Sequence, residues 1–170
     1  MSVKTLHDLV VSADKYKRYS RVTEAMIASQ DLKALSEEVD KMHKIRSDRN
    51  QHINVSVKRL IKLNMEDQAF RSRIIHVVMS VRKVYDILEF AASTIEAWIM
   101  SQYRAHLTGS WADRNAVACR FTVSARQHLV GMSSLLEFCD QAIKDIDSAS
   151  WRYKAILTAM ELNSRPEMRI

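Results

Sequence analysis

Apolar residues recur along the last part of the chain at spacings that alternate between three and four. This register runs from Leu129 to Met160 and is the heptad pattern of a helix that packs lengthwise against other helices. Its positions are Leu129, Met132, Leu136, Cys139, Ile143, Ile146, Ser150, Tyr153, Leu157 and Met160. A second row, seven residues apart, comprises Leu135, Ala142, Ala149 and Ile156. The wider stripe predicts a helix with more than one neighbour.

An equally regular seam precedes it, from Ile74 to Gln102. Its positions are Ile74, Val77, Val81, Val84, Leu88, Ala91, Ile95, Trp98 and Gln102. Gly109 is expected to end this helix in a left-handed cap, and Ser110 opens the turn. Because so short a turn joins only adjacent elements, the two long helices are predicted to be antiparallel neighbours.

The fold class expected is an all-α, elongated helical bundle of about four helices, with the long heptad-patterned helices third and fourth. The helices span residues 5–29, 31–63, 65–108 and 113–163. Expected start signals are Thr5 with Asp8, Asp31, Asn64 with Asp67, and Asp113. With only two glycines and one proline among 170 residues, turns are scarce. We expect one all-helical domain: N-terminal helices in 1–63, a hairpin in 64–163 and a frayed tail in 164–170.

A bend is expected in the fourth helix, either near Thr122, Val123 and Ser124 or at Gly131. β-branched residues and glycine weaken the interior of a helix. An early cluster, Lys15 to Arg21, interleaves four cations with Tyr16 and Tyr19. Neighbouring residues on a helix are about 100° apart, so we expect the tyrosines to pack inward and the charges to face water.

Several classes of function lack a sequence signature. No nucleophile elbow, phosphate loop or zinc-protease motif occurs, so an enzyme is not expected, and no cofactor is implied. His43 and His52 are nine residues apart, a poor spacing for a metal site, and Cys139 lies on the seam as a reduced core thiol would. No apolar membrane span or secretory leader is evident, so a cytoplasmic protein is expected, in the host cell if it is viral.

Positive charge is concentrated in one segment, from Lys41 to Lys62. Its seven cations are Lys41, Lys44, Arg46, Arg49, Lys58, Arg59 and Lys62, against the single acid Asp48. The excess of +6 equals the formal net charge of the whole chain. Arg46 and Arg49 stand where the helical register calls for apolar residues, so we expect this stretch to face water, an acidic partner or a polyanion. A frayed or solvent-exposed section of a long helix is the alternative.

The seams also predict self-association. Together with Trp98, Trp111, Trp151 and nine methionines, they offer more apolar surface than an elongated monomer readily buries. A homo-oligomer is therefore expected. The alternative is an antiparallel hairpin of the two long helices that buries this surface by itself.

The closing helix resembles that of the recombination mediator proteins of T-even-type phages, the UvsY family. The residues that carry the resemblance are Leu136, Glu137, Phe138, Cys139, Ala142, Ile143, Ile146, Ser148, Trp151, Tyr153, Lys154, Ala155 and Ile156. The family has Arg and Gly just before the aromatic residue, where this chain has Ala149 and Ser150. The family's basic, tyrosine-rich motif before a glycine has two possible counterparts here: Tyr103, Arg104, Leu107, Thr108 and Gly109, or Lys58, Arg59 and Leu60.

The resemblance implies an oligomer, ring-like in that family, that binds single-stranded DNA. It also implies partners: a RecA-like recombinase that is being loaded, and a single-strand-binding protein that is displaced. The nucleic-acid-binding residues expected are Lys41, Lys44, Arg46, Arg49, Lys58, Arg59, Lys62, Arg104, Arg152 and Lys154. The rival interpretation is a helical structural or scaffold protein of a virion or of a secretion or tail apparatus, with packaged nucleic acid as a further contact.

Overall fold

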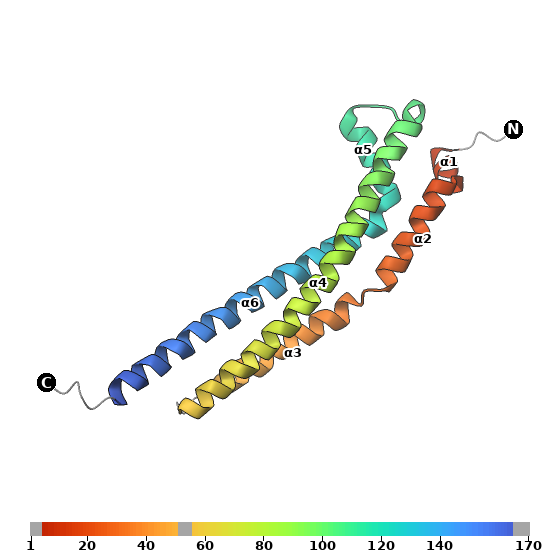
Figure 1. Cartoon of the computed structure of the whole chain (residues 1–170). Coiled ribbons are helices and arrows are strands. Elements are labelled where there is room, and N and C mark those ends of the chain that lie inside the picture. Colours follow the sequence, from red (N-terminus) through yellow and green to blue (C-terminus); the bar gives the residue numbers. More distant parts are fainter. Residues whose placement is uncertain (1–4, 51–55, 165–170) are drawn as a thin grey trace. The chain divides into compact units, whose positions relative to one another are not determined.

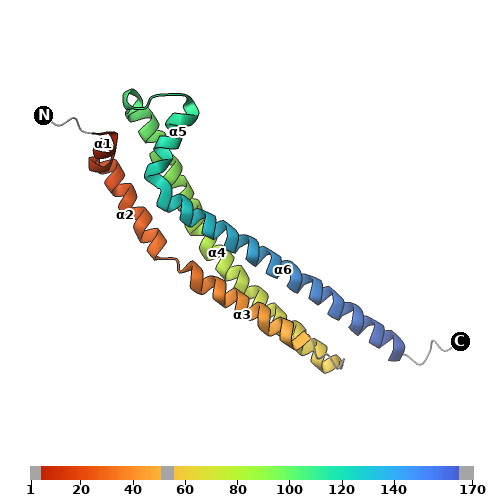
Figure 2. The same cartoon turned by 180° about the vertical axis from the view of Figure 1, so that it is seen from behind.

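The computed structural model describes residues 5–50 and 56–164, and the fold is all α-helical (Figures 1 and 2). Of the described residues, 93% are helical and none lies in a strand, which confirms the predicted helical bundle. The helices are α1 (Leu6–Ser12), α2 (Asp14–Ala28), α3 (Leu32–Asn50), α4 (Val57–Gln102), α5 (Trp111–Cys119) and α6 (Val123–Ser164). Short 3-10 helices η1 (Arg104–His106) and η2 (Arg120–Thr122) flank α5. None of the described helices is apolar over a stretch long enough to cross a membrane.

The chain divides into two compact units, and the long helices α4 and α6 contribute to both. Unit 1 comprises the described residues of Met1–Leu32 and Ser80–Ser134. Unit 2 comprises the described residues of Lys33–Met79 and Leu135–Ile170. Each unit therefore has its own core and its own surface.

Unit 1 buries an apolar cluster of Val10, Ile95, Ile99 and Ala118. Tyr16 and Tyr19 pack against this cluster while the cations of the Lys15 to Arg21 cluster stay exposed, as their helical positions predicted. The Tyr16 hydroxyl donates to the Phe121 carbonyl oxygen over 3.2 Å, which gives the inward-facing phenol a partner. The α1–α2 arm is thereby joined to the chain just before α6.

Unit 2 packs α3, the first part of α4 and most of α6 together. Leu60 and Leu63 of α4 pack with Ala149 and Tyr153 of α6. Three contacts show the direction of these helices: Asn64 and Gln68 hydrogen-bond to Ser150, while Arg71 pairs with Asp147. Later residues of α4 contact earlier residues of α6, so the two helices are antiparallel in unit 2.

The same antiparallel order holds in unit 1, where Arg126 hydrogen-bonds to Ser93 and the earlier Thr122 hydrogen-bonds to the later Glu96. The seam of α6 is buried or half-buried throughout, as its heptad pattern predicted. The seam of α4 slips by one residue after Leu88, and Ala92 and Ile99 are fully buried where Ala91 and Trp98 were expected. A straight helix has 3.6 residues per turn, so a strict heptad row drifts away from its partner.

Several predicted boundaries are wrong. The first helix is interrupted at Ala13, whose backbone is extended. Just before this break, the Ser12 hydroxyl donates to the Leu9 carbonyl oxygen, a side-chain bond that competes with the backbone bonds of a helix. The third helix begins at Val57 rather than after Asn64, so Asn64 and Asp67 lie inside α4. Their side chains bond to neighbouring helices and do not cap a start.

The expected turn between the long helices is longer than predicted. Gly109 has a φ of +94°, the left-handed conformation expected of it, but α4 has already ended at Gln102. Ser110 caps α5 together with Asp113, so that helix starts at Trp111. The predicted bend corresponds to η2, and α6 continues through Gly131 as a regular helix. The predicted tail, 164–170, lies outside the described residues from 165 onward.

Candidate nucleic-acid interface

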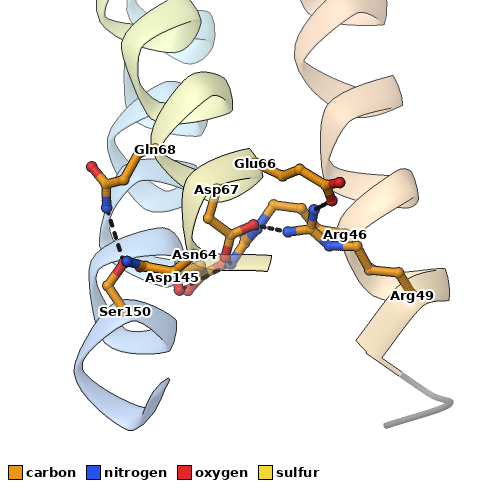
Figure 3. A network of polar contacts seen from close by, with 8 residues as sticks. All are labelled: Arg46, Arg49, Asn64, Glu66, Asp67, Gln68, Asp145 and Ser150. Carbon is orange, nitrogen blue, oxygen red and sulfur yellow. Dashed lines mark hydrogen bonds and ion pairs between the residues drawn. The ribbon is translucent and has the colours of Figure 1, made fainter. Parts of the chain in front are cut away.

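Arg46 lies buried in unit 2, in an ion pair with Asp67 (Figure 3). Its Nε donates to Asp67 Oδ1 over 3.2 Å, and its Nη2 donates to the Asp145 carbonyl oxygen over 3.3 Å. Arg46 is 6% exposed and Asp67 is fully buried, so water cannot solvate either charge. The arginine therefore links α3 to both α4 and α6, which explains a cation at a core-facing position.

Arg49, one turn further along α3, is also neutralised within the unit. Its Nη1 lies 2.7 Å from Glu66 Oε2, and Asp67 is a second partner. The guanidinium also lies over the Phe70 ring, 5.6 Å from its centroid. The expectation that Arg46 and Arg49 face water or a polyanion is thus wrong: their anions come from α4 of the same unit.

Ser150, the one polar residue in the α6 seam, completes this network (Figure 3). Its Oγ accepts a hydrogen bond from Gln68 Nε2 and donates one to Asn64 Oδ1, each over 3.0 Å. The buried hydroxyl has a partner both as a donor and as an acceptor, so a serine is tolerated in the seam. Asn64 and Asp67 therefore hold α3, α4 and α6 together.

The other cations of the Lys41 to Lys62 segment are exposed. Lys58, Arg59 and Lys62 line a groove of about 420 Å³ near the start of α4, beside Arg49 and Glu66. Lys62 has a distant partner in Glu66, 3.9 Å away, whereas no described carboxylate lies within ion-pair distance of Lys58 or Arg59. The groove thus presents unneutralised positive charge.

Lys41 and Lys44 lie on the exposed face of α3. Lys44 Nζ is 2.8 Å from Asp40 Oδ2, and this carboxylate raises the lysine pKa above its usual value. Lys44 is therefore partly neutralised by its own helix. The structure brings Lys41 no described ion-pair partner.

A second groove, of about 270 Å³, opens between α3 and α6. His43 and Ser47 line it on α3, and Ser148 and Arg152 line it on α6. Trp151 is 73% exposed, and Lys154 Nζ lies 5.6 Å from its ring centroid. The exposed indole can stack on an unpaired base while nearby cations such as Lys154 neutralise phosphates.

The expected binding residues do not all come together. Lys58, Arg59, Lys62, Arg152 and Lys154 belong to the surface of unit 2, whereas Arg104 belongs to unit 1. Trp151 was not among the predicted binding residues. The sequence pattern already indicated its exposure, because Trp151 falls outside both apolar rows of α6 and is therefore expected to face solvent.

No protein-family model, curated protein or solved structure matches the chain. Among the described residues, no group of three or more His, Cys, Asp or Glu side chains is placed to hold a metal ion. The likeness of α6 to the UvsY family stays an expectation.

Proposed function

We propose that the protein binds single-stranded nucleic acid through the cationic surface of unit 2. The observation that carries the proposal is the exposed Trp151, which has Lys154 beside its ring and immediately precedes Arg152 in α6. The exposed indole presents a large, flat aromatic face that is accessible to a ligand. Base–aromatic stacking is tolerant of sequence and requires an unpaired base, which favours single strands over duplexes.

The two grooves of unit 2 offer cations for the backbone of such a ligand. Lys58 and Arg59 are exposed and free of described carboxylate partners, so they can replace the counterions of phosphates. Lysine and arginine side chains that neutralise phosphates carry no information about the base sequence. Binding without regard to sequence is the expected result.

A more specific role follows from the resemblance of α6. We propose that the protein acts as an oligomeric recombination mediator, loading a RecA-like recombinase on DNA held by a single-strand-binding protein. Large exposed apolar side chains support self-association: Phe90 is 74% exposed and Met65 is 68% exposed. Several copies would turn a weak patch into a strong binding surface, since linked sites act at a high effective concentration.

The same exposed side chains favour a second candidate, a structural or scaffold protein. Phe90 and Trp111 would then contact protein partners, and the cations of unit 2 would serve solubility. The two functions differ in the assembly they require. Small closed rings that bind single strands support the mediator, whereas open filaments that bind no nucleic acid support the scaffold.

The test is a titration of fluorescently labelled single-stranded and duplex DNA of equal length at two salt concentrations. We expect tighter binding of the single strand, and Trp151→Ala should weaken it by roughly tenfold, the equivalent of one lost stacking contact. Trp151→Phe should retain most of the affinity. Leu162→Ala, which removes another exposed apolar side chain of α6, is the matched control.

Wild-type protein that binds neither DNA at low salt would end the nucleic-acid proposal. Equal loss in Trp151→Ala and Leu162→Ala would instead show that general disturbance of α6, rather than stacking, weakens binding.

A further inference from the structure

Unit 1 has a groove of about 640 Å³ where the end of α4 faces α5. Its polar lining includes Ser101, Arg104, Arg114 and Asn115, and Trp111 forms part of its rim. Trp111 is 66% exposed. The groove therefore combines two guanidinium groups, an accessible indole and an amide within one unit.

The groove carries positive charge because Glu96, the one acid among the described residues that line it, is neutralised by Arg126. The Glu96 carboxylate accepts Arg126 Nη2 over 2.6 Å and Arg126 Nε over 3.0 Å, and Thr122 Oγ1 bonds to it as well. No described carboxylate lies within ion-pair distance of Arg104 or Arg114. Both guanidinium groups are therefore available to an anionic ligand.

The backbone that carries Arg104 is held in place. Tyr103 packs edge-on against Trp98 with ring centroids 5.4 Å apart, and its hydroxyl donates to the Leu9 carbonyl oxygen over 3.2 Å. The Leu107 amide donates to the Arg104 carbonyl oxygen over 3.3 Å and closes η1. A cation on an anchored turn loses little conformational freedom when it binds.

Trp111 and Arg114 are positioned by the cap of α5. Ser110 and Asp113 bond reciprocally, with the Ser110 amide 2.9 Å from Asp113 Oδ2. Gly109 makes this possible: at its φ of +94°, an added Cβ would lie 2.8 Å from that same oxygen. Arg114 Nε donates weakly to the Ser110 carbonyl oxygen over 3.4 Å, and its terminal nitrogens have no partner among the described residues.

We infer that this groove binds a phosphorylated nucleoside. Arg104 and Arg114 would hold the phosphate, Trp111 would stack on the base, and Asn115 would hydrogen-bond to a polar edge. The site lies in unit 1 and shares no residue with the surface of unit 2, so it goes beyond the proposed function. The nucleotide can be free or can be the phosphorylated end of a single strand.

The test follows the indole N–H resonances of full-length ¹⁵N-labelled protein, assigned by replacing Trp98, Trp111 and Trp151 with Phe one at a time. The probes are adenosine 5′-monophosphate, adenosine, inorganic phosphate and a short single strand with or without a 5′-phosphate. We expect the monophosphate to shift the Trp111 resonance at concentrations at least roughly tenfold below those needed for adenosine or phosphate alone. Arg104→Ala and Arg114→Ala should each weaken binding by about tenfold, and the exposed Arg82→Ala should not.

The outcomes separate the two sources of ligand and the two sites. A Trp111 response to the monophosphate assigns a free nucleotide, and a response only to the 5′-phosphorylated strand assigns a strand end. The inference is overturned if neither probe shifts Trp111, or if adenosine binds as well as its monophosphate. A strand that shifts Trp151 but not Trp111 would leave the unit 2 proposal standing and remove this one.

Discussion

Arg46 and Asp67 form an ion pair in which both side chains are buried, with Arg46 Nε 3.2 Å from Asp67 Oδ1. The two residues come from α3 and α4, and Arg49 shares the same carboxylate. Removing Asp67 leaves one guanidinium buried without its anion. The pair is therefore structural, and its rupture should unfold the protein more readily.

The first prediction concerns this carboxylate. Asp67→Ala should lower the free energy of unfolding by about 3 to 5 kcal/mol, the usual cost of stranding a buried charge. Urea denaturation followed by circular dichroism measures the loss. Asp147→Ala is the matched control, because the Asp147 side chain is 45% exposed in its ion pair with Arg71. This substitution should lower the free energy of unfolding by less than about 1 kcal/mol. Equal losses in the two variants would mean that Asp67 is solvated.

The sequence predicts features that depend on residues close together in the chain, and it does not predict contacts between residues far apart in it. The burial of Ile146 and Val81 depends on helical periodicity alone, and their positions in the two rows predicted it. The partner of Arg46 lies 21 residues away on another helix, a proximity that exists only after folding. Asp67 also stands three residues after Asn64, so it resembled a helix-start signal and its role was misassigned.

The second prediction concerns the α6 seam. Ile146 is fully buried, so Ile146→Ala should cost about 2 to 5 kcal/mol of unfolding free energy. Leu136→Ala and Ile143→Ala should fall near the lower end, because both side chains are half-buried. Ile156→Ala serves as the control, since Ile156 is 37% exposed, unlike the buried residues earlier in its row. A loss below about half a kcal/mol at Ile146 would place this seam in water.

The third prediction is a dependence on pH through Glu96. Burial alone raises the pKa of Glu96, but hydrogen bonds from Arg126 and Thr122 outweigh it and hold the pKa below the ordinary value of 4.5. Because the folded pKa is depressed, this stabilisation is complete above about pH 4.5 and is lost as the pH falls through the folded pKa. Glu96→Gln should therefore cost about 1.5 kcal/mol at pH 7 and progressively less in acid.

Thermal or urea unfolding at pH 7 and at several lower pH values checks this. Glu89→Gln, an exposed acid on the same helix, is the control. A difference between wild type and Glu96→Gln that stays constant down to pH 3 would contradict the assigned protonation.

The fourth prediction concerns the cysteines. Burial raises the pKa of Cys139 to about 11, with the Asp140 carboxylate adding to the effect. At pH 8 the thiolate is then roughly one part in a thousand, and it is also inaccessible. We expect iodoacetamide to modify half-buried Cys119 first and Cys139 only in denaturant, as peptide mass spectrometry can show. Rapid labelling of native Cys139 would mean that the core of unit 2 opens readily.

The last prediction is the salt dependence of single-strand binding, which rests on the proposed function of unit 2. If Lys58, Arg59, Lys62 and Arg152 each contact a phosphate, log affinity should fall with log salt at a slope of roughly −3, at about 0.7 per contact. Lys58→Gln with Arg59→Gln removes two contacts, so the slope should flatten by about 1.4. Neither side chain has a described carboxylate partner, and the fold should be unaffected.

Lys33→Gln with Lys144→Gln is the matched control for this double variant. Both lysines are exposed on unit 2 and lie next to a carboxylate one helical turn away, so neither adds free positive charge. The slope should stay within about 0.3 of the wild-type value, less than half of one contact. Equal flattening in both double variants would indicate a diffuse effect of net charge, because a localised site responds only to its own cations. An unchanged slope in Lys58→Gln with Arg59→Gln would move the phosphate contacts away from the start of α4.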